Sequence, residues 1–177
     1  ERAEIIREKG TNRSRFFRGQ VDKYSWVDIG SSYLPSEVLA AILLAQLESR
    51  TAIQQKRKEI WESYANHLKD WGELNGVRLP IIPEYCEHPY HMFYLLMPAL
   101  DIRTRFIEWM KSRGILCVFH YLPLHLSKMG ISFGGKSGDC PVTEDISDRL
   151  VRLPMFFNLE QNDLDYIVEQ IVDFNQF

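Results

Sequence analysis

A basic, aromatic-rich segment near the start of the chain carries its strongest chemical signal. Residues 9–36 hold five of the 21 lysines and arginines and directly precede a very apolar stretch. Arginine binds phosphate through a planar fork of N–H donors, lysine binds it as a point charge, and aromatic rings stack on flat bases. This combination indicates a site for a nucleotide diphosphate. The candidate residues are Arg13, Arg15, Arg18, Lys23 and Tyr24.

Two other interpretations of this segment remain open. A solvated, charged turn needs no ligand at all. Single-stranded nucleic acid would use similar cations and rings, but the formal net charge of −3 and the modest basic count favour a compact ligand over an extended strand.

A second candidate site follows an apolar stretch at 115–119, which predicts a buried strand. His120, Tyr121 and His125 come directly after it, on a loop stiffened by Pro123. Loops that leave strand ends are common positions for functional groups. The pattern is equally compatible with a structural loop whose rings only pack.

Residues 130–137, GISFGGKS, formally satisfy the phosphate-binding pattern G-x-x-x-x-G-K-[ST]. That pattern works only between a strand and a helix, where backbone N–H groups and the helix dipole meet the phosphates. The preceding residues do not form a strand pattern, and Gly138 and Pro141 would break the required helix. A flexible glycine-rich loop is therefore the better interpretation, and a nucleotide-hydrolysing P-loop is a minor alternative.

The cysteines and histidines predict neither a disulfide framework nor a metal site. The three cysteines are widely separated, which fits a reducing, cytoplasmic setting. Cys117 lies in an apolar run and is expected in the core. The histidines do not form a helical ligand pair of the kind that zinc sites use. No apolar run has the ~20 residues of a membrane-spanning helix.

The order of patterns predicts an α+β protein, in which a small sheet is covered by helices. Asp101 and Thr143 are the expected N-caps of two helices, and Ser36 is the expected N-cap of the apolar helix that follows it. That helix is apolar on nearly every face, so we expect it to be buried all round. We expect helices at 2–9 and 38–47, then a long amphipathic helix with apolar residues from 53 to 71 on one side. A helix follows Asp101 and stops before Gly114, a short one follows Thr143, and the last is marked by the spacing of apolar residues from 164 to 172. The expected strands lie at 91–97, 115–119 and 151–153.

Five stretches resemble the DegT-type nucleotide-sugar aminotransferases, which are fold-type I enzymes that use pyridoxal 5'-phosphate. They are EKGTNRSRFFRGQVDKYSWVDIGSSYLPSE (8–37), AQLE (45–48), HMFY (91–94), VFHYLPLH (118–125) and RLVRLPMFFNL (149–159). The resemblance covers essentially the whole chain. It is greatest to the transaminase group that acts on dTDP-4-keto-6-deoxyglucose with glutamate as amino donor, in surface-polysaccharide biosynthesis.

The resemblance implies a domain organisation and a set of roles. Residues 1–36 would be the tail of the cofactor-binding large domain, and residues 37–177 would form the C-terminal small domain. Ser31, Ser32 and Tyr33 would contact the cofactor phosphate of the neighbouring subunit in a homodimer. Arg13, Arg15, Arg18, Lys23 and Tyr24 would face the nucleotide diphosphate or hexose, and His120, Tyr121 and His125 would line the sugar side.

The family's Schiff-base lysine has no counterpart among the eight lysines of these 177 residues. The chain also opens with a charged helix pattern at Glu1, so we expect it to be the C-terminal part of a longer protein and to be inactive alone. A non-catalytic module that associates through the apolar helix is the alternative. No nucleic-acid or membrane partner is expected.

Overall fold

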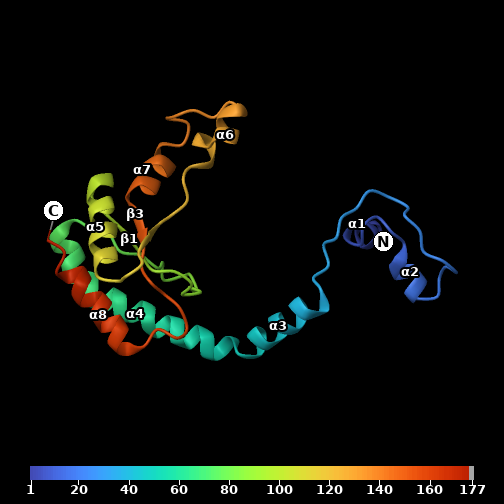
Figure 1. Cartoon of the computed structure of the whole chain (residues 1–177), viewed down its shortest axis with the longest axis horizontal. Coiled ribbons are helices and arrows are strands. Elements are labelled where there is room, and N and C mark those ends of the chain that lie inside the picture. Colours follow the sequence, from blue (N-terminus) through green and yellow to red (C-terminus); the bar gives the residue numbers. More distant parts are fainter. Residues whose placement is uncertain (176–177) are drawn as a thin grey trace. The chain divides into compact units, whose positions relative to one another are not determined.

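The computed structural model describes residues 1–175, and their contacts divide the chain into two compact units (Figure 1). The first unit is Glu1–Arg50, and the second begins at Thr51. The sequence pattern instead predicted a boundary between residues 36 and 37. By its contacts, helix 37–48 belongs to the first unit. The assignment of the two parts to a large and a small domain stays a prediction.

The second unit is built around a three-stranded antiparallel sheet with the order β1-β3-β2. Strand β3 (Leu150–Arg152) is central and pairs with both β1 (Tyr94–Leu96) and β2 (Val118–Phe119). Its helical elements are α4 (Arg50–Asn75), α5 (Leu100–Ser112), η1 (Leu124–Leu126), α6 (Lys128–Ser132), α7 (Pro141–Arg149) and α8 (Gln161–Val172). The predicted α+β class is confirmed.

One face of this sheet and three helices form the hydrophobic core. Side chains alternate between the faces of a strand, so Phe93, Leu95 and Met97 share a face, and all three are completely buried. Helices α4, α5 and α8 supply the other core side chains. These include Ile60, Trp61, Tyr64, Leu68, Trp71, Phe106, Met110, Leu164, Ile167 and Ile171.

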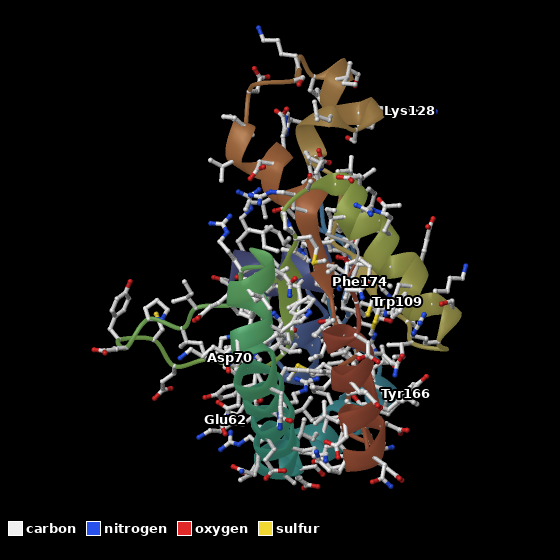
Figure 2. All side chains as sticks on the ribbon, turned by 90° about the vertical axis from the view of Figure 1, so that its left-hand side faces the viewer. Glu62, Asp70, Trp109, Lys128, Tyr166 and Phe174 are labelled. Atoms are coloured by element: carbon white, nitrogen blue, oxygen red, sulfur yellow. The ribbon has the colours of Figure 1, made fainter. Side chains whose placement is uncertain are left out.

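Aromatic contacts join the C-terminal end of the described chain to α5. The Phe174 ring lies 5.3 Å from that of Phe106 and 6.0 Å from that of Trp109, measured between centroids, both edge-on (Figure 2). The Trp109 indole N–H also donates to the carbonyl of Gln170, at 2.9 Å. These contacts hold the C-terminal end of α8 and the residues after it against α5.

Three helix ends test the capping expectations. Ser36 is the N-cap of α3 (Glu37–Glu48), where its hydroxyl accepts from Leu39 N at 3.3 Å. The two other expected caps, Asp101 and Thr143, are wrong: Ala99 precedes α5, two residues earlier, and Cys140 precedes α7, three residues earlier. The helix α7 starts at Pro141, because the fixed φ of proline suits the first helical position.

The first unit contains α1 (Arg2–Arg7), α2 (Arg13–Phe17) and α3. The sequence pattern did not predict α2, which lies inside the basic segment. The turn after α1 depends on Gly10, whose φ of 73° is left-handed and whose added Cβ would lie 1.8 Å from the carbonyl oxygen of Asp28. Glycine is therefore required where these two stretches of backbone meet.

The expectation that the apolar helix is buried all round is wrong for this chain. All residues of α3 are exposed, and the exposed fractions of its large apolar side chains run from 52% at Leu47 to 69% at Val38. The buried apolar side chains that the structure describes all lie in the second unit, between Ile60 and Phe174. The composition of α3 therefore indicates a covering surface that these residues do not supply. No helix within residues 1–175 is both long and apolar enough to cross a membrane.

We expect Leu68→Ala to lower the free energy of unfolding by about 2–5 kcal/mol, because it leaves a cavity in a fully buried position. The matched control is Leu74→Ala in the same helix, where the leucine is 85% exposed and the expected change is below about 0.5 kcal/mol. Urea denaturation followed by circular dichroism measures both. Equal effects of the two substitutions would contradict the packing described here.

Candidate functional site

A cavity of about 310 Å³ in the first unit brings together several of the predicted site residues. Arg13, Tyr24 and Ser32 all line it, although up to 19 positions separate them in the sequence. Its other lining residues are Arg7, Glu8, Lys9, Thr11 and Leu34. Three cations against one carboxylate make this concavity suitable for an anion.

Arg13 is held in this cavity by aromatic rings. Its guanidinium carbon lies 5.2 Å from the centre of the Phe17 ring and 5.7 Å from that of Tyr24. A guanidinium over an aromatic face is attracted by the ring quadrupole. The Glu8 carboxylate lies 3.8 Å from its Nε, at the long end of ion-pair distance. Arg13 is therefore positioned while most of its N–H donors stay available.

The turn at residues 30–33 is fixed by backbone hydrogen bonds to the end of α1. Lys9 N donates to Ser31 O at 3.1 Å, Tyr33 N donates to Arg7 O at 3.1 Å, and Ser32 forms a bridge with Glu8. Of the three predicted cofactor contacts only Ser32 lines the cavity. The Tyr33 side chain is 67% exposed.

Arg15 and Arg18 are occupied by acidic partners on α1. Arg18 binds both carboxylate oxygens of Glu4, at 2.9 and 3.0 Å, and this bond holds the pKa of Glu4 below its ordinary value. Arg15 forms an ion pair with Glu1. Sequence reasoning missed these partners, although the helical spacing of Glu1, Glu4 and Glu8 was a usable signal. A substrate role for either arginine requires these pairs to open, and it stays a prediction.

Lys23 and Tyr24 differ in their surroundings. Lys23 is exposed and forms no hydrogen bond or ion pair with any residue that the structure describes. Tyr24 is half exposed and its ring lies 5.7 Å from that of Phe16, edge-on. Lys23 therefore keeps its charge available for a phosphate.

The three predicted sugar-side residues lie in the second unit, at and beyond the end of β2. The His120 ring packs against Tyr121 with centroids 5.0 Å apart, and its Nδ1 is buried without a hydrogen-bond partner. Tyr121 is 76% exposed. His125 contacts neither of these two rings in the structure; its side chain binds Glu144 instead.

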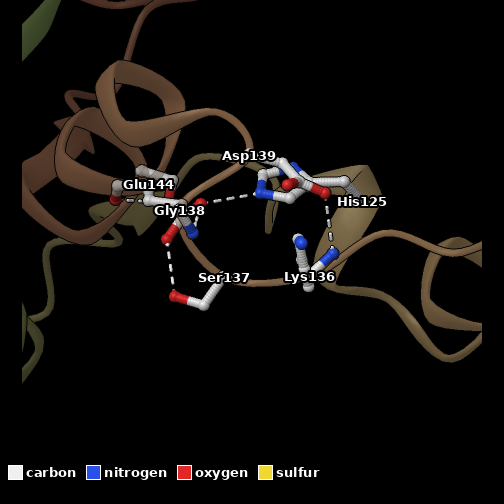
Figure 3. A network of polar contacts seen from close by, with 7 residues as sticks. His125, Lys136, Ser137, Gly138, Asp139 and Glu144 are labelled. Carbon is white, nitrogen blue, oxygen red and sulfur yellow. Dashed lines mark hydrogen bonds and ion pairs between the residues drawn. The ribbon is translucent and has the colours of Figure 1, made fainter.

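Glu144 of α7 closes the loop that contains His125 (Figure 3). Its carboxylate pairs with His125 Nε2 at 2.9 Å and accepts from Gly138 N at 2.9 Å and from the Ser137 hydroxyl at 3.0 Å. These bonds favour the ionised carboxylate, with His125 the largest cause, and lower the pKa of Glu144 to about 2. No sequence pattern indicated Glu144, because its partners lie six, seven and 19 residues before it.

The same contacts exclude a phosphate-cradling loop at residues 130–137. Gly130 lies within α6, so the pattern does not follow a strand. The Lys136 N–H donates to Asp139 at 3.0 Å, and the Gly138 N–H and Ser137 hydroxyl are taken by Glu144 (Figure 3). Donors that a phosphate would need are already bonded within the loop, so the rejection of a P-loop agrees with this geometry.

The remaining cysteine and histidine expectations concern packing. Cys117 is 2% exposed, and burial raises the pKa of its thiol to about 12, so it is an inert core residue. Within residues 1–175 no group of three or more His, Cys, Asp or Glu side chains is arranged to hold a metal ion.

We expect Glu144→Gln to make the free energy of unfolding depend less on pH in the acidic range. The folded-state pKa of Glu144 is depressed, so the wild-type carboxylate contributes stability above its ordinary pKa of 4.5, and this contribution is lost as the pH falls toward about 2. Chemical denaturation at a series of acidic pH values measures the effect. Glu62→Gln, at an exposed carboxylate 3.7 Å from Lys58, is the control. If the free energy of unfolding of the wild type and of Glu144→Gln varied with pH in the same way, the proposed stabilising role of the Glu144 contacts would be wrong.

Comparison with known proteins gives a family match over most of the chain. Residues 1–172 match the DegT/DnrJ/EryC1/StrS aminotransferase family. The chain is 29% identical over 97% of its length to the uncharacterized protein MJ1066 of Methanocaldococcus jannaschii, and 26% identical over 92% to the GDP-perosamine synthase of Escherichia coli O157:H7. These alignments span 45% and 44% of the two relatives, so the chain spans under half their length.

Solved structures show the same fold. The DesV structure from S. venezuelae, in complex with a ketimine intermediate, aligns with a TM-score of 0.83 at 22% identity, over 97% of this chain and 43% of that one. The PMP-form of the putative sugar aminotransferase Spr1654 from Streptococcus pneumoniae aligns with a TM-score of 0.82 at 21% identity, over 96% and 41%. With the family match over 172 residues, this chain belongs to the DegT/DnrJ/EryC1/StrS aminotransferase family.

Proposed function

We propose that the protein containing this chain is a sugar aminotransferase that uses pyridoxal 5'-phosphate. It would move an amino group from glutamate to a dTDP-4-keto-6-deoxyhexose, in the synthesis of surface-polysaccharide sugars. Family membership over residues 1–172 is the observation that carries the reaction class. The nucleotide and the sugar are the finer part of the proposal. Relatives are named for both GDP- and dTDP-linked sugars.

The cavity of the first unit fits the phosphate end of the cofactor. Ser32 offers a hydroxyl beside Lys9 and Arg13, and no bond within the described residues engages that hydroxyl. We assign Ser31, Ser32 and Tyr33 to the cofactor phosphate of a neighbouring subunit, which requires a homodimer. Pyridoxal phosphate, when bound, accepts the amino group from the donor and stabilises the negative charge that develops during the transfer. The residues of this chain would bind and orient it and neutralise its phosphate.

The same segment would also grip the nucleotide sugar. Arg13 and Tyr24 line the cavity, and Lys23 directly precedes Tyr24 in the chain. Two cations and a ring suit a diphosphate joined to a flat base. Arg15 and Arg18 would join them if their α1 carboxylates gave way. His120, Tyr121 and His125 are assigned to the hexose side.

In the whole enzyme we expect Arg15→Ala and Lys23→Ala to raise KM for the nucleotide sugar more than they lower kcat. Both cations would contact phosphates remote from the reacting carbon, where binding is equal in the ground and transition states. Loss of one charge-assisted bond corresponds to roughly tenfold or more in KM. Lys111→Ala, at an exposed lysine of α5 outside the site, is the control.

The measurement is steady-state transamination of dTDP-4-keto-6-deoxyglucose with glutamate, followed by mass spectrometry of the amino sugar. A wild-type enzyme that transfers no amino group to any nucleotide keto-sugar would refute the proposed function. Unchanged KM in both variants of an active enzyme would remove only the two residue assignments.

A second candidate function is a non-catalytic module that associates through α3. The observation in its favour is the exposure of every apolar side chain on this helix. An apolar surface of this kind drives association in water. The two candidates differ in the whole protein, because an enzyme would bury α3 against the rest of its own chain, whereas an association module would keep it exposed for a partner.

We expect the isolated chain to self-associate and Leu43→Lys to weaken this association, since a lysine in the middle of α3 opposes burial of the helix. Light scattering over a concentration series gives the mass. Leu74→Lys is the control, because this leucine is an isolated exposed residue of α4. A wild-type chain that stays monomeric at all concentrations would remove the association module.

A further inference from the structure

The outer face of the sheet carries a cavity in which the proposed function assigns a role to His120 and to no other lining residue. In the register of the sheet, Arg152 of the central strand lies opposite Tyr94 on one side and Val118 on the other. Because side chains alternate, these residues share the face that points away from the core of α4, α5 and α8. A cavity of about 350 Å³ lies there, lined by Arg152 together with His91, His120, Leu116, Val118 and Met155, among others.

Arg152 is a cation without an anion. It is half-buried, and no carboxylate among residues 1–175 lies within ion-pair distance of it. Its one hydrogen bond, from Nη2 to the carbonyl of Phe119, is long at 3.5 Å, and its Nε is buried without a partner. By contrast, Arg149, three residues earlier at the end of α7, is paired with Asp145. A partly desolvated guanidinium is costly unless it is paired.

The other polar groups of the cavity also favour an anion. The His120 Nδ1 is a second buried polar atom without a partner, and His91 is exposed at the rim. No aspartate or glutamate lines the cavity. Leu116, Val118 and Met155 give it apolar walls beside the cationic group.

We propose that this cavity binds a small organic carboxylate. The Arg152 guanidinium would bind the carboxylate, and a short aliphatic chain would pack on Leu116, Val118 and Met155. A carboxylate matches a single planar fork flanked by apolar walls, whereas a fully charged phosphate calls for more donors than one partly engaged arginine offers. Identifying this acid with the amino donor rests on the proposed function; binding of the acid does not.

The test is an NMR titration of the full chain with butyrate, with butyramide as the uncharged isostere and inorganic phosphate as the alternative anion. We expect saturable shifts of the backbone amides at 116–120 and 151–155 with butyrate, and weaker or no shifts with the other two. Arg152→Gln should weaken butyrate binding roughly tenfold or more. Arg105→Gln, which removes an exposed arginine paired with Asp101 at 3.2 Å, should leave it unchanged.

Equal binding of butyramide, stronger binding of phosphate, or shifts confined to other residues would each overturn the proposal. So would an Arg152→Gln variant that is folded by circular dichroism and binds butyrate as the wild type does. If that variant does not fold, butyrate binding by Arg152→Lys is measured instead, together with the positions of the amide shifts in the wild type. Wild-type affinity in Arg152→Lys with shifts outside residues 116–120 and 151–155 would then overturn the proposal. A failed titration leaves the transamination assay unaffected, so the two proposals fail separately.

Discussion

The second unit depends on a sheet with one fully buried face, which packs against three helices. Leu95 and Val151 lie opposite each other in the register, and both are completely buried on the face that packs against the helices. Tyr64 adds a polar tie, because its hydroxyl donates to the carbonyl of Pro154 just beyond β3, at 2.9 Å. With α4, α5 and α8 committed to that face, the opposite face is where side chains such as Arg152 are presented. Packing of one face against the helices therefore fixes where Arg152 lies on the other face.

The first unit is organised by polar contacts instead of a core. Gly10 is its one buried residue among those the structure describes, and the close approach of its backbone to that of Asp28 sets the path of the basic segment. Ion pairs between α1 carboxylates and arginines of the segment then hold α2 against α1. Exposed pairs of this kind contribute little stability. The exposed ion pairs and the exposed apolar helix α3 together indicate that this unit is stabilised by contact with further protein surface.

Much of the fold was predictable because local rules agree with the tertiary structure. The spacing of Leu164, Ile167 and Ile171 predicted α8, and each of these residues is buried. Gly114, with its φ of 76°, ends α5 as its position suggested. The strands came out shorter than their apolar runs, because antiparallel pairing with the three-residue β3 limits how much of each run can form a ladder. Helices α2 and α6 were missed, since both are five residues long and lie in segments that read as loops.

The types of residue in the candidate site could be predicted from the sequence, but their hydrogen-bond and ion-pair partners could not. The sequence by itself determined the periodic helices, the α+β class and the presence of a basic, aromatic segment, because these follow from local propensity and composition. Only the tertiary structure decided that Arg13 lines a cavity while Arg18 is bound by Glu4, and that Glu144 binds His125. It also decided that Arg152 has no carboxylate partner within residues 1–175. The physical reason is that an electrostatic or hydrogen-bonding role depends on distances of a few ångströms between residues far apart in the chain. A one-dimensional pattern carries no such distances.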